Sequence, residues 1–148
     1  MFEAIVVGTD GSDTATKAVA AAADIARRHD ATLHVVSAFA PVSRQRLREE
    51  GRQIAYDVEW TVNPREDVDA TLRDAEALTG GGGGVNVRTY AREGDPADAI
   101  LDVAEERDSD LIVVGNKGMT GAKRFLLGSV PNKVSHHAPC SVLIIRTV

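Results

Sequence analysis

Four short, mostly apolar runs set the framework of this chain. Each is followed by a glycine or a polar residue, a pattern typical of strands buried on both faces of a parallel sheet. A fifth segment, 85–90, alternates apolar and polar residues, as expected of a strand at a sheet edge. The four runs are Ala4–Val7, Leu33–Val36, Leu111–Val114 and Val142–Ile145. We therefore expect four well-covered strands and one edge strand.

Apolar residues at helical spacing predict helices between these strands. After the first strand, small apolar residues recur from Ala15 to Ala26, with Ser12 as the expected N-cap. Further helices are expected over 66–78, from Pro96 with Asp95 as its N-cap, and over 129–137. Strands that alternate with helices form βαβ units, whose strands are parallel. The pattern predicts an α/β fold: an open, doubly wound sheet of five parallel strands with about four helices.

The stretch 110–130 gives the clearest indication of a binding site in the sequence. A buried strand runs into Gly115, and further glycines follow at Gly118 and Gly128, the last directly before Ser129. A strand, a glycine-containing loop and a helix start together present free backbone N–H groups to an anion. Glycine also lets the backbone approach a phosphate closely. The spacing fits neither the P-loop nor the G-x-G-x-x-G fingerprint of dinucleotide-binding proteins.

The spacing does resemble the signature of the universal stress protein family: a glycine, two residues, a glycine, nine residues, then glycine followed by serine or threonine. Gly115, Gly118, Gly128 and Ser129 fill every position. The start IVVGTDGS and the tail GSVPNKVSHHAPCSVLIIR also resemble the family, so the likeness covers essentially the whole chain. It implies one Rossmann-like domain over 1–148, with the strand order 3-2-1-4-5 and helices on both faces.

In that strand order a ligand is expected in the crevice beyond the carboxyl ends of strands one and four. The resemblance implies that ATP binds there, with Mg²⁺ carried by the nucleotide itself. Adenosine is expected near Asp10 and Ala38, and the phosphates near the glycines and Ser129. The expected ATP-binding residues are Thr9, Asp10, Ala38, Val114, Gly115, Gly118, Gly128, Ser129 and Val130.

Several of these residues also have a plainer structural explanation. Asp10 could serve only the start of the first helix, and Gly115 could be a turn glycine alone. Ser129 could act as an N-cap, alone or while it binds phosphate. Lys117, Lys123 and Arg124 make the loop locally basic, but such charges usually lie on a solvated face.

Two other stretches contain residues typical of binding sites, but their context argues against a site in either. The five glycines at 80–84 follow a helix and precede a strand, which places them at the amino edge of the sheet. Because ligands of open α/β sheets bind at the other edge, a flexible linker is the better interpretation. His136 and His137 are adjacent on a helix, face different directions and have no nearby ligand at metal spacing, so no metal site is expected.

Composition narrows the class of protein. The chain has 148 residues, a formal net charge of −5 and a single cysteine, Cys140. The negative charge argues against binding duplex nucleic acid. One cysteine cannot form an intrachain disulfide and fits a reducing cytoplasm. No signal peptide or membrane span is apparent, so a cytoplasmic location without membrane association is expected.

The leading functional interpretation is an ATP-binding, nucleotide-responsive regulatory module in a stress response. No Ser-His-Asp set, carboxylate pair or activated cysteine predicts catalysis, so enzyme activity is left open, at most as slow ATP hydrolysis. The resemblance implies a homodimer that pairs through strand 142–146. The alternatives are a nucleotide hydrolase and a protein-interaction dimer whose glycine loop is purely structural.

Overall fold

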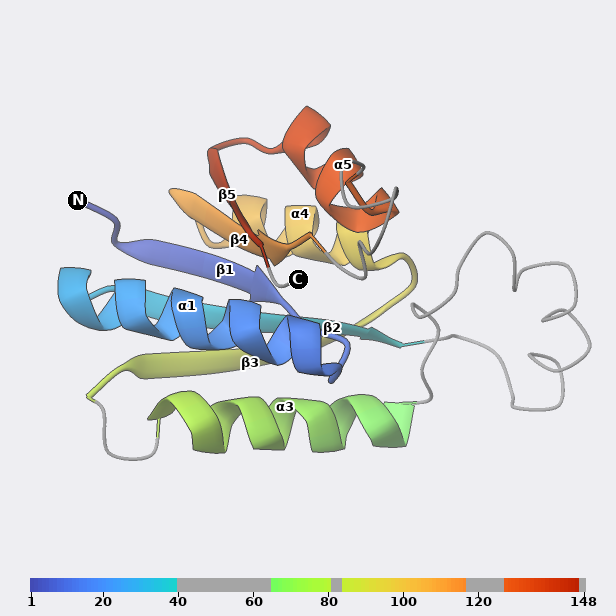
Figure 1. The fold of residues 1–148 in the computed structure, drawn as a ribbon, viewed down its shortest axis with the longest axis horizontal. Coiled ribbons are helices and arrows are strands. Elements are labelled where there is room, and N and C mark those ends of the chain that lie inside the picture. Colours follow the sequence, from blue (N-terminus) through green and yellow to red (C-terminus); the bar gives the residue numbers. More distant parts are fainter. Residues whose placement is uncertain (40–64, 81–83, 117–126, 147–148) are drawn as a thin grey trace, which may run out of the picture.

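Five parallel strands form one sheet in the computed structural model, which describes residues 1–39, 65–80, 84–116 and 127–146. The strand order is β3-β2-β1-β4-β5, so the expected order 3-2-1-4-5 is confirmed (Figure 1). Because β1 pairs with both β2 and β4, the chain switches direction along the sheet at β1. The strands are β1 (Ala4–Gly8), β2 (Thr32–Phe39), β3 (Asn86–Glu93), β4 (Leu111–Gly115) and β5 (Ser141–Ile145).

The helices cover both faces of the sheet, as a doubly wound fold requires (Figure 1). Helices α1 and α3 pack on one face and α4 and α5 on the other. Their bounds are α1 (Asp13–His29), α3 (Arg65–Gly80), α4 (Pro96–Glu106) and α5 (Ser129–His137). The predicted helices therefore exist, and α3 extends beyond the expected 66–78 at both ends.

Side-chain caps explain where two of the helices begin. Ser12 Oγ accepts a hydrogen bond from the N–H of Ala15 at 3.2 Å and caps α1. Asp95 caps α4 in the same way, accepting from the N–H of Asp98 at 3.0 Å, and Pro96 follows as the first helical residue. Both N-caps were expected, because these side chains satisfy N–H groups that have no partner within a helix.

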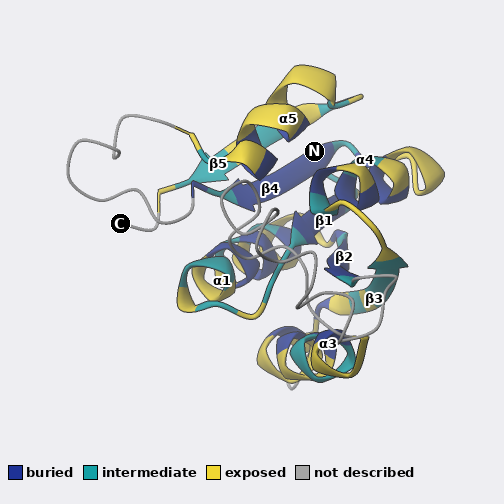
Figure 2. Cartoon of the chain, turned by 90° about the vertical axis from the view of Figure 1, so that its right-hand side faces the viewer, coloured by how far each residue is buried: buried dark blue, intermediate teal, exposed yellow. Residues whose placement is uncertain are grey.

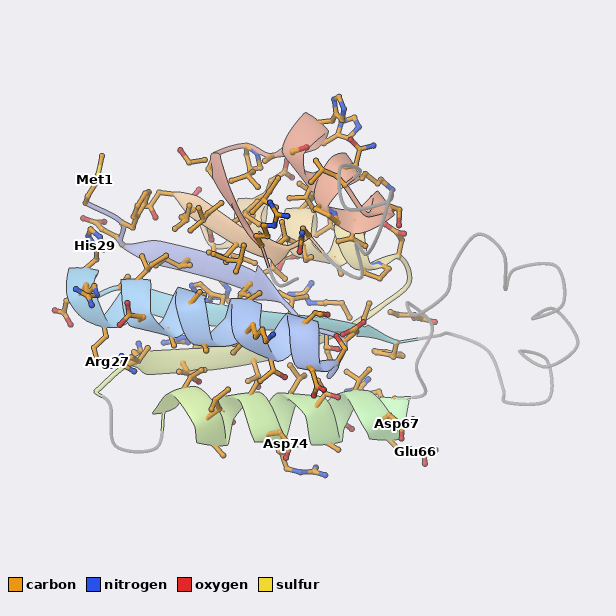
Figure 3. The ribbon with its side chains drawn as sticks, viewed as in Figure 1. Met1, Arg27, His29, Glu66, Asp67 and Asp74 are labelled. Carbon is orange, nitrogen blue, oxygen red and sulfur yellow. The ribbon has the colours of Figure 1, made fainter. Side chains whose placement is uncertain are left out.

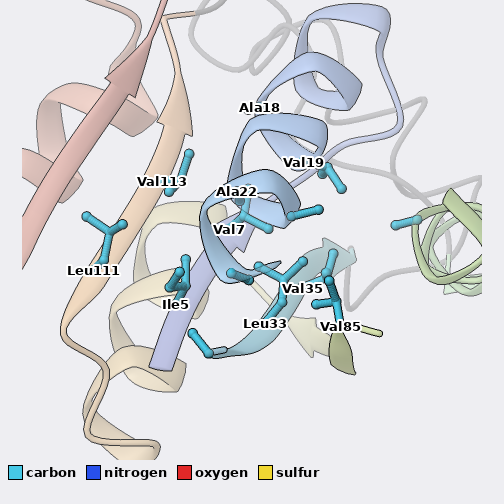
Figure 4. Packing of buried hydrophobic residues seen from close by; sticks show 14 of the residues in the cluster. Ile5, Val7, Ala18, Val19, Ala22, Leu33, Val35, Val85, Leu111 and Val113 are labelled. Atoms are coloured by element: carbon cyan, nitrogen blue, oxygen red, sulfur yellow. The ribbon is translucent and has the colours of Figure 1, made fainter. Parts of the chain in front are cut away.

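The core has one layer on each side of the sheet. Figure 4 shows Ile5, Val7, Leu33 and Val35 facing the inner side of α1. Alanines on α1 let it approach the sheet closely, and Ala18 and Ala22 are fully buried. The other layer packs Val6, Val36, Ile112 and Val114 against apolar residues of α4 and α5. The central strands are thus covered on both faces.

The final strand is less covered than its apolar sequence suggested. We expected Val142–Ile145 to be buried on both faces, but β5 is the sheet edge opposite β3 and its residues are exposed or half-buried. Figure 2 shows this difference between β5 and its buried neighbour β4. The cause is position: among the described strands β5 pairs only with β4, so no described strand covers its outer side. Leu143 is 36% exposed.

The amino and carboxyl ends of the parallel strands lie at opposite sides of the sheet, and different groups lie at each of these two sides. Met1 and His29 lie together at the amino edge, where the terminal amine is 3.4 Å from the His29 Nδ1 (Figure 3). Gly80 and Gly84 flank the passage from α3 to β3 at this same edge, as predicted for the glycine run. The loop after β1 and the end of β4 lie at the carboxyl edge. The arginine-rich segment 44–52 lies outside the described residues.

Candidate functional site

A pocket opens at the carboxyl edge of the sheet, where β1 and β4 end side by side. This is the switch point of the sheet, the place where open α/β folds bind ligands. The wall is mostly apolar, with polar atoms gathered at the start of α1. The lining residues are Gly8, Thr9, Asp10, Ser12, Thr14, Ala15, Val36, Pro96, Ile100, Val114, Gly115, Val130 and Pro131.

The pocket brings together five of the nine predicted site residues: Thr9, Asp10, Val114, Gly115 and Val130. Gly128 and Ser129 immediately precede Val130 at the start of α5 but do not line the pocket. Ala38 is buried near the end of β2 and is not part of the wall either. Gly118 lies outside the described residues, as do Lys117, Lys123 and Arg124.

The loop between β1 and α1 is held by a compact set of hydrogen bonds. The N–H of Thr9 donates to the carbonyl of Val36 at 2.9 Å, which fixes the loop to β2. Asp10 Oδ1 accepts from the N–H of Ser12 at 3.0 Å, and Thr9 Oγ1 accepts from the N–H of Gly11 at 3.1 Å. Asp10 thus shapes the approach to α1 and also lines the pocket.

Two glycines of this region lie in close contact with neighbouring side chains. Gly11 has a φ of +83°, which favours glycine, and a Cβ there would lie 2.8 Å from Thr71 Oγ1. A Cβ at Gly8 would lie 2.4 Å from Ile100 Cδ1, so the end of that side chain would have to shift. These contacts shape the loop and the pocket floor without requiring any ligand.

Gly128 differs from both of these glycines. It is the N-cap of α5, with the ordinary backbone angles φ −62° and ψ 165°. A Cβ built there would meet Pro131 Cδ at 3.6 Å and the carbonyl oxygen of Asn116 at 3.7 Å, which are ordinary contacts. Neither backbone strain nor crowding therefore explains a glycine at this position.

The start of α5 is left without a side-chain cap. Gly128 has no side chain to accept a hydrogen bond, and Ser129 is the first helical residue rather than the N-cap we had considered. No described residue accepts a hydrogen bond from the backbone N–H of Ser129 or Val130. Unpaired N–H groups and the positive end of the helix dipole favour an anion at such a position.

The sequence matches one family model almost from end to end. The model of the universal stress protein family matches residues 1–146. The chain belongs to the universal stress protein family. It is 38% identical over 146 residues to a universal stress protein of Mycobacterium tuberculosis, with 99% of this chain and 97% of that one aligned. It is 35% identical over 158 residues to a universal stress protein of Bacillus subtilis, with 99% and 100% aligned.

Solved structures of universal stress proteins have the same fold. One, in complex with cAMP, has a TM-score of 0.76 and 34% identity and covers 99% of both chains. Another, from Archaeoglobus fulgidus in complex with dAMP, has a TM-score of 0.67 and 27% identity and covers 97% of both chains. Two structural relatives of this universal stress protein therefore hold adenine nucleotides.

Sequence reasoning missed the part of the wall that α4 and the first turn of α5 contribute. Pro96, Ile100 and Pro131 all line the pocket. Asp95 and Pro96 fixed where α4 begins, and that start follows the carboxyl end of β3, so the sequence did hold a signal for Pro96. Ile100 and Pro131 become lining residues only through the packing of α4 and α5 on the sheet, for which no local pattern existed.

The described residues contain no group of three His, Cys, Asp or Glu side chains placed to hold a metal ion. None of the helices in the described parts of the chain is both long and apolar enough to cross a membrane.

Proposed function

We propose that this universal stress protein binds an adenine nucleotide, specifically ATP, in the pocket at the carboxyl edge of its sheet. The protein would act as a nucleotide-responsive regulatory module in the cytoplasm. The observation that carries this proposal is the meeting of three features at one edge: an apolar pocket, the carboxylate of Asp10 and the uncapped start of α5. The adenine nucleotides in two structural relatives support the same ligand class.

Each part of the nucleotide has a matching surface. The adenine ring would lie against apolar wall residues such as Val36, Val114 and Ile100. Asp10 would accept hydrogen bonds from the ribose hydroxyls, since a carboxylate accepts without donating. The phosphates would extend toward Ser129 and Val130, whose N–H groups and the Ser129 hydroxyl can donate.

A bound Mg²⁺ would be held mainly by the phosphates. Asp10 is the only acidic residue among the described residues that line the pocket. Mg²⁺ usually keeps several waters and needs few protein ligands when phosphates are present. The same scarcity of acid–base groups leads us to propose binding rather than rapid turnover of ATP.

Calorimetric titration of the nucleotide-stripped protein with ATP and Mg²⁺, with AMP and GTP in parallel, tests the proposal. We expect saturable binding that favours ATP over both. Asp10→Ala should weaken ATP binding about tenfold, because it removes an acceptor for the ribose. Asp13→Ala is the matched control, since this exposed carboxylate lies only three residues away and outside the pocket wall.

Absence of binding at millimolar ATP would refute the proposal and leave the start of α5 as an architectural feature. If Asp10→Ala and Asp13→Ala weakened ATP binding equally, the nucleotide site would stand, but Asp10 would not be one of its specific contacts. A preference for AMP over ATP would keep the adenine class and exclude the triphosphate.

A further inference from the structure

A proline occupies the first turn of the helix that faces the pocket. Pro131 is the third residue of α5, is buried, and lines the pocket beside Val130. The α5 hydrogen-bond ladder begins one residue later, where the N–H of Asn132 donates to the carbonyl of Gly128 at 3.1 Å. Pro131 therefore occupies the last position in this turn at which a backbone N–H would have no acceptor within the helix.

Proline has no backbone N–H, so the start of α5 has one donor fewer than an ordinary helix. The helix loses nothing by this, because an N–H at that position has no partner within the helix anyway. An anion-binding site does lose a donor. Of the first three helical residues, only Ser129 and Val130 keep an N–H that a phosphate oxygen could accept from.

The proline ring also adds to the apolar wall. It lines the same pocket as the side chains of Ile100, Val114 and Val130. Burial of a ligand's apolar surface against such a wall contributes binding free energy in proportion to the area covered. One residue thus strengthens the apolar part of the site and weakens its anion-binding part.

We infer that Pro131 is a specificity-determining residue that shifts recognition from the phosphates to the adenosine portion of the nucleotide. The inference rests on the proposed function and deepens it. Adenosine should gain most of its affinity from the pocket wall, and each phosphate should add less than it would at a helix start with all its N–H groups. The site then binds mainly the adenosine portion of the nucleotide, and its contacts with the phosphates contribute less to the affinity.

Pro131→Ala tests this inference because it restores the missing N–H and removes the ring. The Kd values of adenosine and AMP are measured by calorimetry for both proteins. The variant should bind adenosine about threefold more weakly, through lost apolar contact. The ratio of the adenosine Kd to the AMP Kd should rise about tenfold, the effect of one additional charge-assisted hydrogen bond.

Val130→Ala is the matched control in the same turn. It removes apolar wall and leaves the number of N–H donors unchanged, so adenosine and AMP should weaken together and their Kd ratio should stay constant. Circular dichroism establishes that each variant is folded, and Pro131→Ser supplies the same N–H on a different side chain if the alanine variant is not.

An unchanged Kd ratio in the folded Pro131 variant would overturn the inference while leaving the nucleotide site intact. The same would follow if Val130→Ala raised the ratio as much. Failure of the wild-type protein to bind adenosine or AMP while it still binds ATP would overturn the inference and leave the proposed function standing, whereas failure to bind ATP as well would refute the proposed function and the inference with it.

Discussion

At the scale of single residues, a buried histidine lies on the α4 side of the sheet. His34 on β2 is 5% exposed, and its Nδ1 lies 2.8 Å from the hydroxyl oxygen of Tyr90 on β3. Arg107 lies over the Tyr90 ring, with its Cζ 5.3 Å from the ring centroid. Burial lowers the pKa of His34 below its ordinary value of 6.5, and the positive charges of Arg107 and Arg88 lower it further.

This environment predicts that acid destabilises the protein through His34. Because the pKa is lower in the folded state, the unfolded chain takes up the proton first as pH falls from about 7. The lost stability is about 1.4 kcal/mol for each unit by which the two pKa values differ, and the loss levels off below the folded pKa. Urea denaturation at a series of pH values should show a shallower pH dependence for His34→Gln than for the wild type. Parallel curves would contradict the prediction.

Gly128 offers a second test at residue scale, because neither its backbone angles nor its surroundings require a glycine at this position. Gly128→Ser should fold normally, since a Cβ fits and serine is a favourable N-cap. The new hydroxyl would accept from the N–H of Val130, the donor that the proposed site offers to phosphate. We expect unchanged or slightly higher stability with at least about tenfold weaker ATP binding, measured by thermal melting and calorimetry. Full ATP affinity in the stable variant would exclude the start of α5 from the site.

At the scale of elements, the sequence predicted what local physics decides. Ser12 and Asp95 mark helix starts because their side chains satisfy N–H groups within three residues along the chain. The runs before Gly8 and Gly115 predicted the two central strands, and hence the edge at which the pocket lies. The contact of Gly8 with Ile100 was beyond prediction, because the two residues are far apart in sequence and meet only through packing. The exposure of β5 was missed for a related reason: its apolar sequence does not reveal which neighbours it has.

The start of α4 gives a prediction at element scale. Asp95 caps α4 and also lies 3.3 Å from Lys133 Nζ on α5, whereas Asp98 pairs with the same Nζ at 2.8 Å and caps nothing. Asp95→Ala should lower the free energy of unfolding by about 1 kcal/mol, the typical cost of a lost N-cap. Asp98→Ala, the control, should cost less, because exposed ion pairs contribute little. If urea denaturation gave equal losses of unfolding free energy for the two variants, the ion pairs with Lys133, and not the N-cap, would be what stabilises the start of α4.

At the scale of the whole molecule, the two open edges of the sheet differ in character. The β3 edge carries exposed polar side chains, including Asn86, Arg88 and Glu93, which discourage pairing with another strand. The β5 edge is short and apolar, and Leu143 is its most exposed large side chain. An apolar edge strand with unpaired backbone groups favours pairing with a second copy. We therefore propose a homodimer through β5, close to the expected segment 142–146.

Leu143→Arg tests this dimer, since a charge in the pairing surface would have to be buried. Sedimentation should give twice the chain mass of 15.7 kDa for the wild type and 15.7 kDa for the variant. Asn86→Arg places the same charge on the β3 edge and should leave the mass unchanged. ATP binding should persist in both variants, because the pocket is built by β1, β4 and helices of one chain. A monomeric wild type, or a dimer that survives Leu143→Arg but not Asn86→Arg, would exclude β5 as the interface and place any assembly elsewhere on the surface.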